Sequence, residues 1–298
     1  MKAAGLLSRP SRDEQTKRRK DARKASKRKM IERDKHARNE TGIRSAREAS
    51  VFVAPKLLSV PSELLNSSKI LESPRNCYVC KTMFTKLHHF YDTMCVDCGD
   101  YNYAKRFQSA DLTGQVAVVT GSRLKIGYHI TLILLRAGAT VVATTRFPVD
   151  SSLRFSKEED FSQWSHRLKI HGLDLRHIPS VEIFCNFIEK QYDRLDILIN
   201  NAGINITGPI ESMKISDMKK VFETNFFSHL NIIQSVLPGM RLNRSGIIIN
   251  ITSIAGYLGL PFWGAYCASK ASFNIIAESL NIELKKFNIN VVNIAPGD

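Results

Sequence analysis

The sequence predicts an α/β fold in which a doubly wound parallel sheet lies between two layers of helices. Short apolar runs typical of strands alternate with longer segments of helical periodicity from Gln115 onward. Such alternation places parallel strands side by side and covers both faces of the sheet with helices. The 298 residues, 43% of them apolar, allow one large domain of this kind together with smaller appendages.

Six strands are expected, and each is a short apolar run bounded by polar residues or glycine. They cover residues 116–120, 140–145, 168–173, 195–199, 246–251 and 289–294. The expected helices cover residues 126–136, 179–192 and 265–287, together with a long helical region that ends near Met240. These elements define a domain over residues 112–298, in which a polar insertion separates the second strand from the third.

A strongly basic segment begins the chain. Residues 1–50 contain 17 Lys or Arg and 7 Asp or Glu, so they carry most of the formal net charge of +15. Because almost no aromatic residue is available for a core, we expect a disordered arm, with a frayed, charged helix as the alternative. Residues 51–73, with Pro55 and Pro61, are expected to form a linker. Nucleic acid or another acidic partner could contact the arm, but we favour a solvated tail.

No segment of the sequence is a candidate for membrane insertion. A run of about 18 apolar residues, the length that a transmembrane helix needs, is absent. The N-terminus also has no apolar stretch of the kind that forms the core of a secretory signal. We therefore expect a cytoplasmic protein with no membrane partner, and the basic clusters leave a nuclear location open.

Four of the six cysteines form a cluster with the spacing of a metal site. Two Cys-x-x-Cys pairs are separated by 14 residues, and the expected ligands are Cys77, Cys80, Cys95 and Cys98. This spacing is typical of a structural zinc site that resembles a zinc ribbon, and four thiolates leave no position open for catalysis. The sequence therefore predicts a zinc-binding segment over residues 74–105. Ligation by His88 or His89, an iron site and a redox pair remain alternatives.

A glycine-containing turn follows the first expected strand of the domain. Gly121 permits a tight turn, and Gly127 permits close approach at the start of the next helix. Free backbone N–H groups at such a helix start, aided by the helix dipole, suit a pyrophosphate. The turn therefore predicts a dinucleotide site that includes Arg123 and Ile126.

The end of the second strand bears on which dinucleotide would bind. An NAD site needs Asp or Glu about 20 residues after the glycine turn to hold the ribose hydroxyls. Here the strand ends in Thr144-Thr145-Arg146, with no acidic residue. Arg146 can pair with a 2′-phosphate and Arg123 can assist, which favours NADP over NAD. In the alternative interpretation, Arg146 merely caps the end of a surface strand.

Two residues suited to proton transfer lie near the C-terminus. Tyr266 and Lys270 are four residues apart on an expected helix, so they share one face. The pKa of an unperturbed Tyr, near 10, is too high for acid–base work at neutral pH. A neighbouring ammonium favours the phenolate, so Lys270 would lower the pKa of Tyr266. Tyr266 could then exchange a proton with a carbonyl or alcohol oxygen.

In their order along the chain, these segments resemble the short-chain dehydrogenase/reductase family. Its fingerprint Thr-Gly-x-x-x-Gly-x-Gly matches at Thr120, Gly121 and Gly127, while Lys125 replaces the middle glycine. A lysine there could face the phosphates or weaken their binding. The resemblance covers residues 112–298 and implies a Rossmann-type fold that converts between a small-molecule carbonyl and a secondary alcohol with NADP.

The resemblance also implies further cofactor-binding residues. The family binds the adenine amino group at the end of its third strand, lines the cofactor with an Asn-Asn-Ala-Gly motif after the fourth, and has a Pro-Gly turn beside the nicotinamide. The residues that match these positions here are Asp174, Leu175, Asn200, Ala202, Gly203, Pro296 and Gly297.

The same resemblance assigns four catalytic residues, namely Ser253, Tyr266, Lys270 and Asn225. In the family, the serine steadies the substrate oxygen and the lysine binds the nicotinamide ribose. The asparagine holds a water that links the lysine to solvent. The implied roles are therefore oxygen stabilisation for Ser253, acid–base transfer for Tyr266 and a proton relay for Lys270 with Asn225.

Two functional interpretations remain open. The first is an active NADP-linked oxidoreductase, and the second is a catalytically impaired relative that uses its zinc segment and basic arm as a binding module. Members of the family usually continue beyond the Pro-Gly turn, so we expect that the C-terminal part of this domain is missing after Asp298. A homo-oligomer is a further open alternative.

Overall fold

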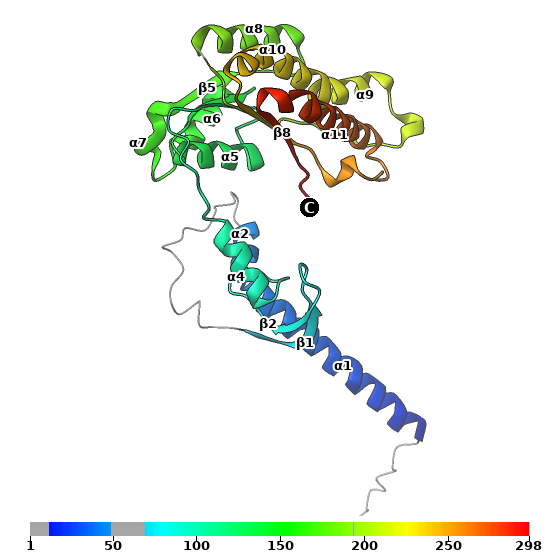
Figure 1. Cartoon of the computed structure of the whole chain (residues 1–298). Coiled ribbons are helices and arrows are strands. Elements are labelled where there is room, and N and C mark those ends of the chain that lie inside the picture. The colour runs from blue at the N-terminus through cyan, green and yellow to red at the C-terminus, as the bar shows by residue number, and fades with distance from the viewer. Residues whose placement is uncertain (1–11, 49–68, 193, 298) are drawn as a thin grey trace, which may run out of the picture. The chain divides into compact units, whose positions relative to one another are not determined.

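The computed structural model describes residues 12–48, 69–192 and 194–297. They form two compact units with the boundary between Gln108 and Ser109. The N-terminal unit carries the cysteine cluster. The C-terminal unit has an α/β fold (Figure 1). No helix among the described residues has both the length and the apolar character needed to cross a membrane.

A six-stranded parallel sheet forms the middle layer of the C-terminal unit, as the sequence predicts. Its strands are β3 (Val116–Val119), β4 (Thr140–Thr145), β5 (Leu168–Gly172), β6 (Ile197–Asn200), β7 (Gly246–Ile251) and β8 (Ile289–Ile294). Their order across the sheet is β5-β4-β3-β6-β7-β8, and all neighbours are parallel. The order reverses between β3 and β6, and doubly wound folds bind ligands at such a switch point.

Helices cover both faces of this sheet. They are α5 (Lys125–Arg136), α6 (Pro148–Phe155), α7 (Phe161–Trp164), α8 (Ile178–Gln191), α9 (Ile215–Phe222), α10 (Ser228–Asn243) and α11 (Gly264–Leu284). Successive strand residues point to opposite faces. Val119 therefore packs with Leu135 of α5, while Val118 packs on the other side with Ile232 of α10 and Phe273 of α11. These two cores produce the predicted three-layer architecture.

The polar insertion between β4 and β5 contains α6 and α7, which the sequence analysis did not predict. Phe155 and Trp164 are buried and lie edge to face, with ring centres 6.3 Å apart. Outside this core, Arg136 of α5 forms ion pairs with Glu158 at 3.0 Å and Asp160 at 2.7 Å. A few buried aromatic residues therefore anchor a segment that is polar in composition.

Helices α1 (Arg12–Asn39) and α2 (Gly42–Glu48) occupy most of the predicted basic arm. The described part of this arm is thus the charged helix that the sequence left as the alternative to disorder. The last turns of α1 contact strand β1 (Ile70–Asn76), because the Asp34 carboxylate accepts hydrogen bonds from the backbone N–H groups of Glu72 at 2.8 Å and Ser73 at 3.1 Å.

Strand β1 pairs antiparallel with β2 (Met83–Lys86), and helix α4 (Val96–Lys105) follows. Because β1 begins at Ile70, the end of the predicted linker 51–73 belongs to a strand instead. Residues 51–68 of that linker lie outside the described residues. A small apolar cluster of Leu71, Phe84 and Leu87, with Cys77, forms the core of this unit.

Candidate functional site

Two glycines shape the turn between β3 and α5. Gly121 has a left-handed backbone, with φ of 67°, and a Cβ there would lie 2.9 Å from Cα of Ala202. A Cβ on Gly127 would lie only 2.4 Å from the carbonyl oxygen of Gly121. Both positions therefore require glycine, which suits a turn that brings backbone N–H groups close to a ligand.

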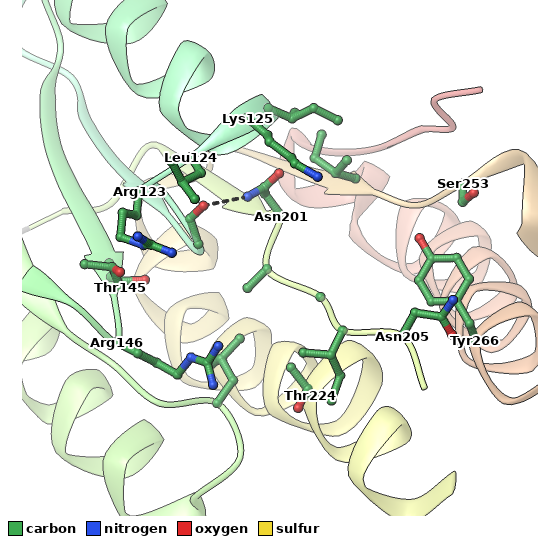
Figure 2. Close-up of a pocket in the computed structure, with 18 of the residues that line it drawn as sticks. Arg123, Leu124, Lys125, Thr145, Arg146, Asn201, Asn205, Thr224, Ser253 and Tyr266 are labelled. Atoms are coloured by element: carbon green, nitrogen blue, oxygen red, sulfur yellow. Dashed lines mark hydrogen bonds between the residues drawn. The ribbon is translucent and has the colours of Figure 1, made fainter. Parts of the chain in front are cut away.

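Asn201 holds this turn against the end of β6. Its side-chain amide donates to the carbonyl oxygens of Thr120 at 2.7 Å and Gly121 at 3.1 Å (Figure 2). In return, the Thr120 hydroxyl accepts from the backbone N–H groups of Asn201 at 2.8 Å and Ala202 at 3.0 Å. These bonds fix the spacing of the two strand ends at the switch point.

A cavity of about 660 Å³ runs along this turn and the carboxyl ends of the strands. This volume is in the range of small-molecule and cofactor sites. In Figure 2, Arg123 and Arg146 lie at one end of the cavity, Ser253 and Tyr266 lie at the other, and Lys125 lies between them. The residues predicted from the sequence that line the cavity are Gly121, Arg123, Ile126, Arg146, Asp174, Leu175, Ala202, Gly203, Ser253, Tyr266, Lys270, Pro296 and Gly297.

Three other predicted residues, Gly127, Asn200 and Asn225, lie behind the wall of the cavity. Asn200 is buried in the sheet and donates to Oδ1 of Asn250 at 3.0 Å. Several other lining residues had no role predicted from the sequence, although they lie at the same strand ends and turns as the predicted ones. Among these are Thr145, Asn201, Ile204 and Asn205. Lys125, for which the sequence left open a contact with the phosphates, also lines the cavity.

The end of the cavity beside β4 is basic. Arg123 pairs with Asp150 at 2.8 Å, and that carboxylate also accepts from Arg154 at 2.7 Å. Arg146 is exposed, and its guanidinium lies 5.5 Å from the ring centre of Phe147. Within the described ranges no carboxylate forms an ion pair with Arg146, so its charge is available to an anionic ligand.

Asp174 lines the cavity at the end of β5 but is already paired. The guanidinium of Arg176 donates to its two oxygens at 2.9 and 2.5 Å. These hydrogen bonds lower the pKa of Asp174 to about 2. The adenine-binding role implied by the family resemblance stays a prediction, and it requires Asp174 to accept a further hydrogen bond beside Arg176.

Ser253, Tyr266 and Lys270 converge at the opposite end of the cavity. Lys270 is buried and donates from Nζ to the carbonyl oxygen of Ile251 at 2.8 Å, while its Nζ lies 5.8 Å from the ring centre of Tyr266. The ring of Trp263 meets Tyr266 edge to face, with centres 5.7 Å apart. Helix α11 and the end of β7 thus bring together side chains that are far apart in sequence.

Burial controls the ionisation of this group. It lowers the pKa of Lys270 from 10.5 to about 8. Burial also raises the pKa of Tyr266, and the hydrogen bond from Ser253 opposes this only in part. The lowering of the Tyr266 pKa expected from Lys270 is outweighed in this geometry, because the ammonium donates to the Ile251 carbonyl and desolvation of the phenol dominates.

Asn225 lies in a π-helical turn, Glu223–Phe227, between α9 and α10. Its Oδ1 accepts from the backbone N–H of Ile204 at 2.8 Å, and its Nδ2 donates to the Ile204 carbonyl at 2.9 Å and to Ser269 Oγ at 3.0 Å. These bonds tie the segment after β6 to α11. The relay role implied for Asn225 stays a prediction.

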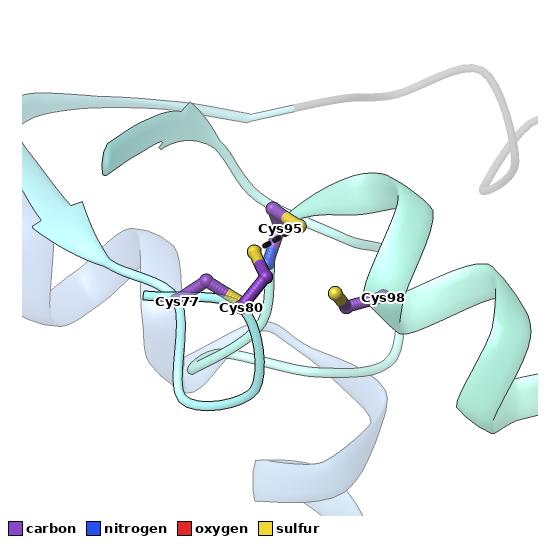
Figure 3. Close-up of side chains that lie close together, drawn as sticks. All are labelled: Cys77, Cys80, Cys95 and Cys98. Carbon is purple, nitrogen blue, oxygen red and sulfur yellow. Dashed lines mark hydrogen bonds between the residues drawn. The ribbon is translucent and has the colours of Figure 1, made fainter. Parts of the chain in front are cut away.

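The four clustered cysteines come together in the N-terminal unit (Figure 3). Cys77 and Cys80 lie around the turn after β1, and Cys95 and Cys98 lie at the start of α4. Their four Sγ atoms are all within 4.8 Å of one another, and those of Cys80 and Cys95 are 3.7 Å apart. Tetrahedral zinc with Zn–S bonds of about 2.3 Å separates its sulfurs by about 3.8 Å, so the cluster has the dimensions of a zinc site.

The histidines considered as alternative ligands have other partners. Nδ1 of His88 accepts hydrogen bonds from the backbone N–H groups of Phe90 and Tyr91 at 3.0 and 3.1 Å, which leaves Nε2 to donate to Asp100 at 3.1 Å. His89 lies with His88 and Asp100, since their ligand atoms are within 4.8 Å of one another, and it does not belong to the sulfur cluster. Four sulfurs therefore form the candidate metal site without a histidine.

A family model described as short chain dehydrogenase matches residues 115–298. The chain belongs to the short-chain dehydrogenase family. The 3-ketodihydrosphingosine reductase of Bacteroides thetaiotaomicron is 33% identical over 184 residues, which cover 62% of this chain and 64% of that protein. Human retinol dehydrogenase 8 is 42% identical over 103 residues, which cover 35% of this chain and 33% of that protein.

Solved structures of short-chain dehydrogenases are similar as well. A metagenomic short-chain oxidoreductase in complex with NADP is 33% identical, with a TM-score of 0.59 over 63% of this chain and 85% of that one. Pseudomonas aeruginosa RhlG with NADP is 32% identical, with a TM-score of 0.57 over 63% and 73%. The predicted family is thereby confirmed, and its members are oxidoreductases that use NAD(P) in general. The chain spans 64% of the length of the Bacteroides reductase and 33% of that of human retinol dehydrogenase 8, so it covers less than two thirds of either relative.

Proposed function

We propose that the C-terminal unit is an NADP-dependent oxidoreductase that interconverts a carbonyl and a secondary alcohol. One observation carries this proposal: a single cavity holds cationic side chains at one end and the group Ser253, Tyr266 and Lys270 at the other. The cationic side chains suit the 2′-phosphate of NADP, and the group Ser253, Tyr266 and Lys270 suits proton transfer during carbonyl reduction.

The residues present fit such a cofactor. Gly121 and Gly127 allow the tight turn that such a cofactor needs, because a Cβ at either position would collide with neighbouring protein atoms. The N-terminus of α5 supplies backbone N–H groups for the pyrophosphate. Arg146, assisted by Arg123, would hold the 2′-phosphate. Lys270 would hold the nicotinamide ribose. The bound cofactor would supply hydride chemistry.

Tyr266 would then act as the proton donor in reduction and as the acceptor in oxidation, through its phenol oxygen. Because burial raises the pKa of Tyr266, the phenol is protonated at neutral pH, which suits reduction. The Ser253 hydroxyl would donate a hydrogen bond to the substrate oxygen as negative charge develops there. Substrates are therefore small molecules with a ketone or aldehyde, or the corresponding alcohol.

NADPH oxidation with a panel of ketones and aldehydes tests this proposal. We expect carbonyl-dependent turnover by the full chain and its loss in Tyr266→Phe, since proton transfer contributes about 10²- to 10⁴-fold. NADPH binding should survive in this variant because only a hydroxyl is removed. Unchanged turnover in Tyr266→Phe would refute the assigned role. Failure to bind NADPH would instead favour the binding-module alternative.

We also propose that Cys77, Cys80, Cys95 and Cys98 hold a structural zinc ion. The mutual distances of the sulfurs support four-coordinate binding, and the apolar core of this unit is small. Metal binding would then supply much of its folding free energy. Elemental analysis of the purified chain should find one zinc per molecule, and its absence after expression in zinc-supplemented medium would count against the site.

A further inference from the structure

Lys125 occupies an unusual position at the start of α5. Its backbone is left-handed, with φ of 52°, a conformation that side chains other than Gly, Asn and Asp rarely adopt. The family has a glycine at this position, and the lysine follows the path that a glycine would take. Its side chain lines the cavity and extends from the first residue of α5 into it (Figure 2).

The charge of Lys125 is not neutralised in this position. Over the described ranges, no Asp or Glu forms an ion pair with it, whereas the neighbouring Arg123 is paired with Asp150. The first turn of α5 also contains no acidic residue. A cation at a helix N-terminus is repelled by the helix dipole. Backbone strain and electrostatic repulsion therefore both disfavour Lys125, and an anion bound here would relieve the second of them.

The place of Lys125 along the cavity indicates which anion. In Figure 2 it lies between the guanidiniums that would face a 2′-phosphate and the end formed by Ser253 and Tyr266. In a dinucleotide, the pyrophosphate lies between the adenosine and the nicotinamide. Resting on the proposed NADP function, we infer that Lys125 pairs with the pyrophosphate and supplies a cation where the family relies on glycine and backbone N–H groups.

Two probes separate this role from binding of the 2′-phosphate. ADP-ribose carries the pyrophosphate without a 2′-phosphate, and adenosine 2′-monophosphate carries only the latter. Calorimetric titration of the full chain should show that Lys125→Asn lowers the affinity for ADP-ribose about tenfold, which equals about 1.4 kcal/mol of binding free energy. The affinity for adenosine 2′-monophosphate should stay within a factor of two or so. The difference for ADP-ribose should shrink at high salt because ions screen an exposed charge.

Three further variants act as controls. Glycine, like asparagine, tolerates the left-handed backbone. Lys125→Gly should therefore lower the affinity for ADP-ribose as much as Lys125→Asn does, while raising the melting temperature. Lys125→Arg keeps the charge and should retain most of the affinity. Lys157→Asn removes an exposed lysine outside the cavity and should change neither titration.

Three results would contradict the inference, and they have different meanings. Unchanged ADP-ribose affinity in Lys125→Asn would show that the Lys125 side chain does not bind the pyrophosphate. If the same protein still binds NADPH, the proposed function would remain supported. Selective loss of adenosine 2′-monophosphate would assign Lys125 to the 2′-phosphate instead. If the unmodified chain binds neither NADPH nor ADP-ribose, the proposed function fails and the inference falls with it.

Discussion

Replacing Lys270 by Met should stabilise the C-terminal unit at neutral pH. The ammonium is buried, with 4% of the residue exposed, and burial lowers its pKa from 10.5 to about 8. Since each pH unit corresponds to about 1.4 kcal/mol, the protonated side chain destabilises the folded state by about 3 kcal/mol. Loss of the hydrogen bond to Ile251 offsets about 1 kcal/mol of the gain, which leaves about 2 kcal/mol.

The sign of the pH dependence follows from the lowered pKa. Below pH 8 the lysine is protonated in both states, so the folded state bears the full penalty. Between pH 8 and 10.5 the folded protein loses its proton first, and the original chain becomes more stable relative to Lys270→Met as the pH rises. The advantage of the variant should therefore be largest at pH 7 and should vanish near pH 10.

Urea denaturation followed by tryptophan fluorescence measures this difference. The two tryptophans of the chain, Trp164 and Trp263, both belong to the C-terminal unit, so their emission reports unfolding of that unit. Free energies of unfolding for the original chain and for Lys270→Met should be compared at pH 7 and pH 9.5. A difference that is independent of pH, or a variant that is less stable at pH 7, would refute the burial argument.

Four further predictions concern the cofactor, the turn, the metal and the pH profile. Arg146→Asp should weaken NADPH binding about 10- to 100-fold and improve NADH binding, as measured by fluorescence titration, because it replaces a phosphate partner by an acceptor for ribose hydroxyls. Gly127→Ala should lower stability by about 3 kcal/mol in urea and abolish NADPH binding, because its Cβ would lie 2.4 Å from the Gly121 carbonyl oxygen. Cys98→Ser should remove bound zinc, measured by elemental analysis, while NADPH affinity stays unchanged. Alcohol oxidation needs the Tyr266 phenolate, and burial raises the pKa of Tyr266. The rate of oxidation should therefore increase toward alkaline pH in a pH–rate profile, and a flat profile would contradict this role of Tyr266.

Sequence periodicity predicted the sheet well because its central strands β3, β4 and β6 are buried on both faces and are therefore largely apolar. Their ends were less predictable. Residue 195 was expected to begin the fourth strand, but β6 begins at Ile197. Just before it, the backbone N–H of Val116 donates to the side-chain carboxylate of Asp196 and not to a backbone carbonyl of that strand. Helices α6 and α7 were missed because they are short and mostly polar, and only Phe155 and Trp164 reveal their buried side.

The positions of the candidate site residues could be predicted from sequence motifs. The side-chain contacts that these residues make could not. Ser253 and Tyr266 meet because strand ends and helix starts converge at one edge of a parallel sheet. The pairing of Asp174 with Arg176 and the bond from Lys270 to Ile251 depend on local geometry that no spacing encodes. The left-handed backbone of Lys125 was equally hidden, because a lysine does not indicate a positive φ.

Titration of the full chain with NADPH and NADH tests most directly whether the cavity binds NADP. Trp263 lines the cavity, so a bound nicotinamide should quench tryptophan emission and gain fluorescence by energy transfer. We predict saturable binding with NADPH preferred over NADH at least tenfold, since a charge-assisted bond to the 2′-phosphate contributes about 1.5–3 kcal/mol. Equal affinity for the two would contradict the role of Arg146, and no binding of either would contradict the account as a whole.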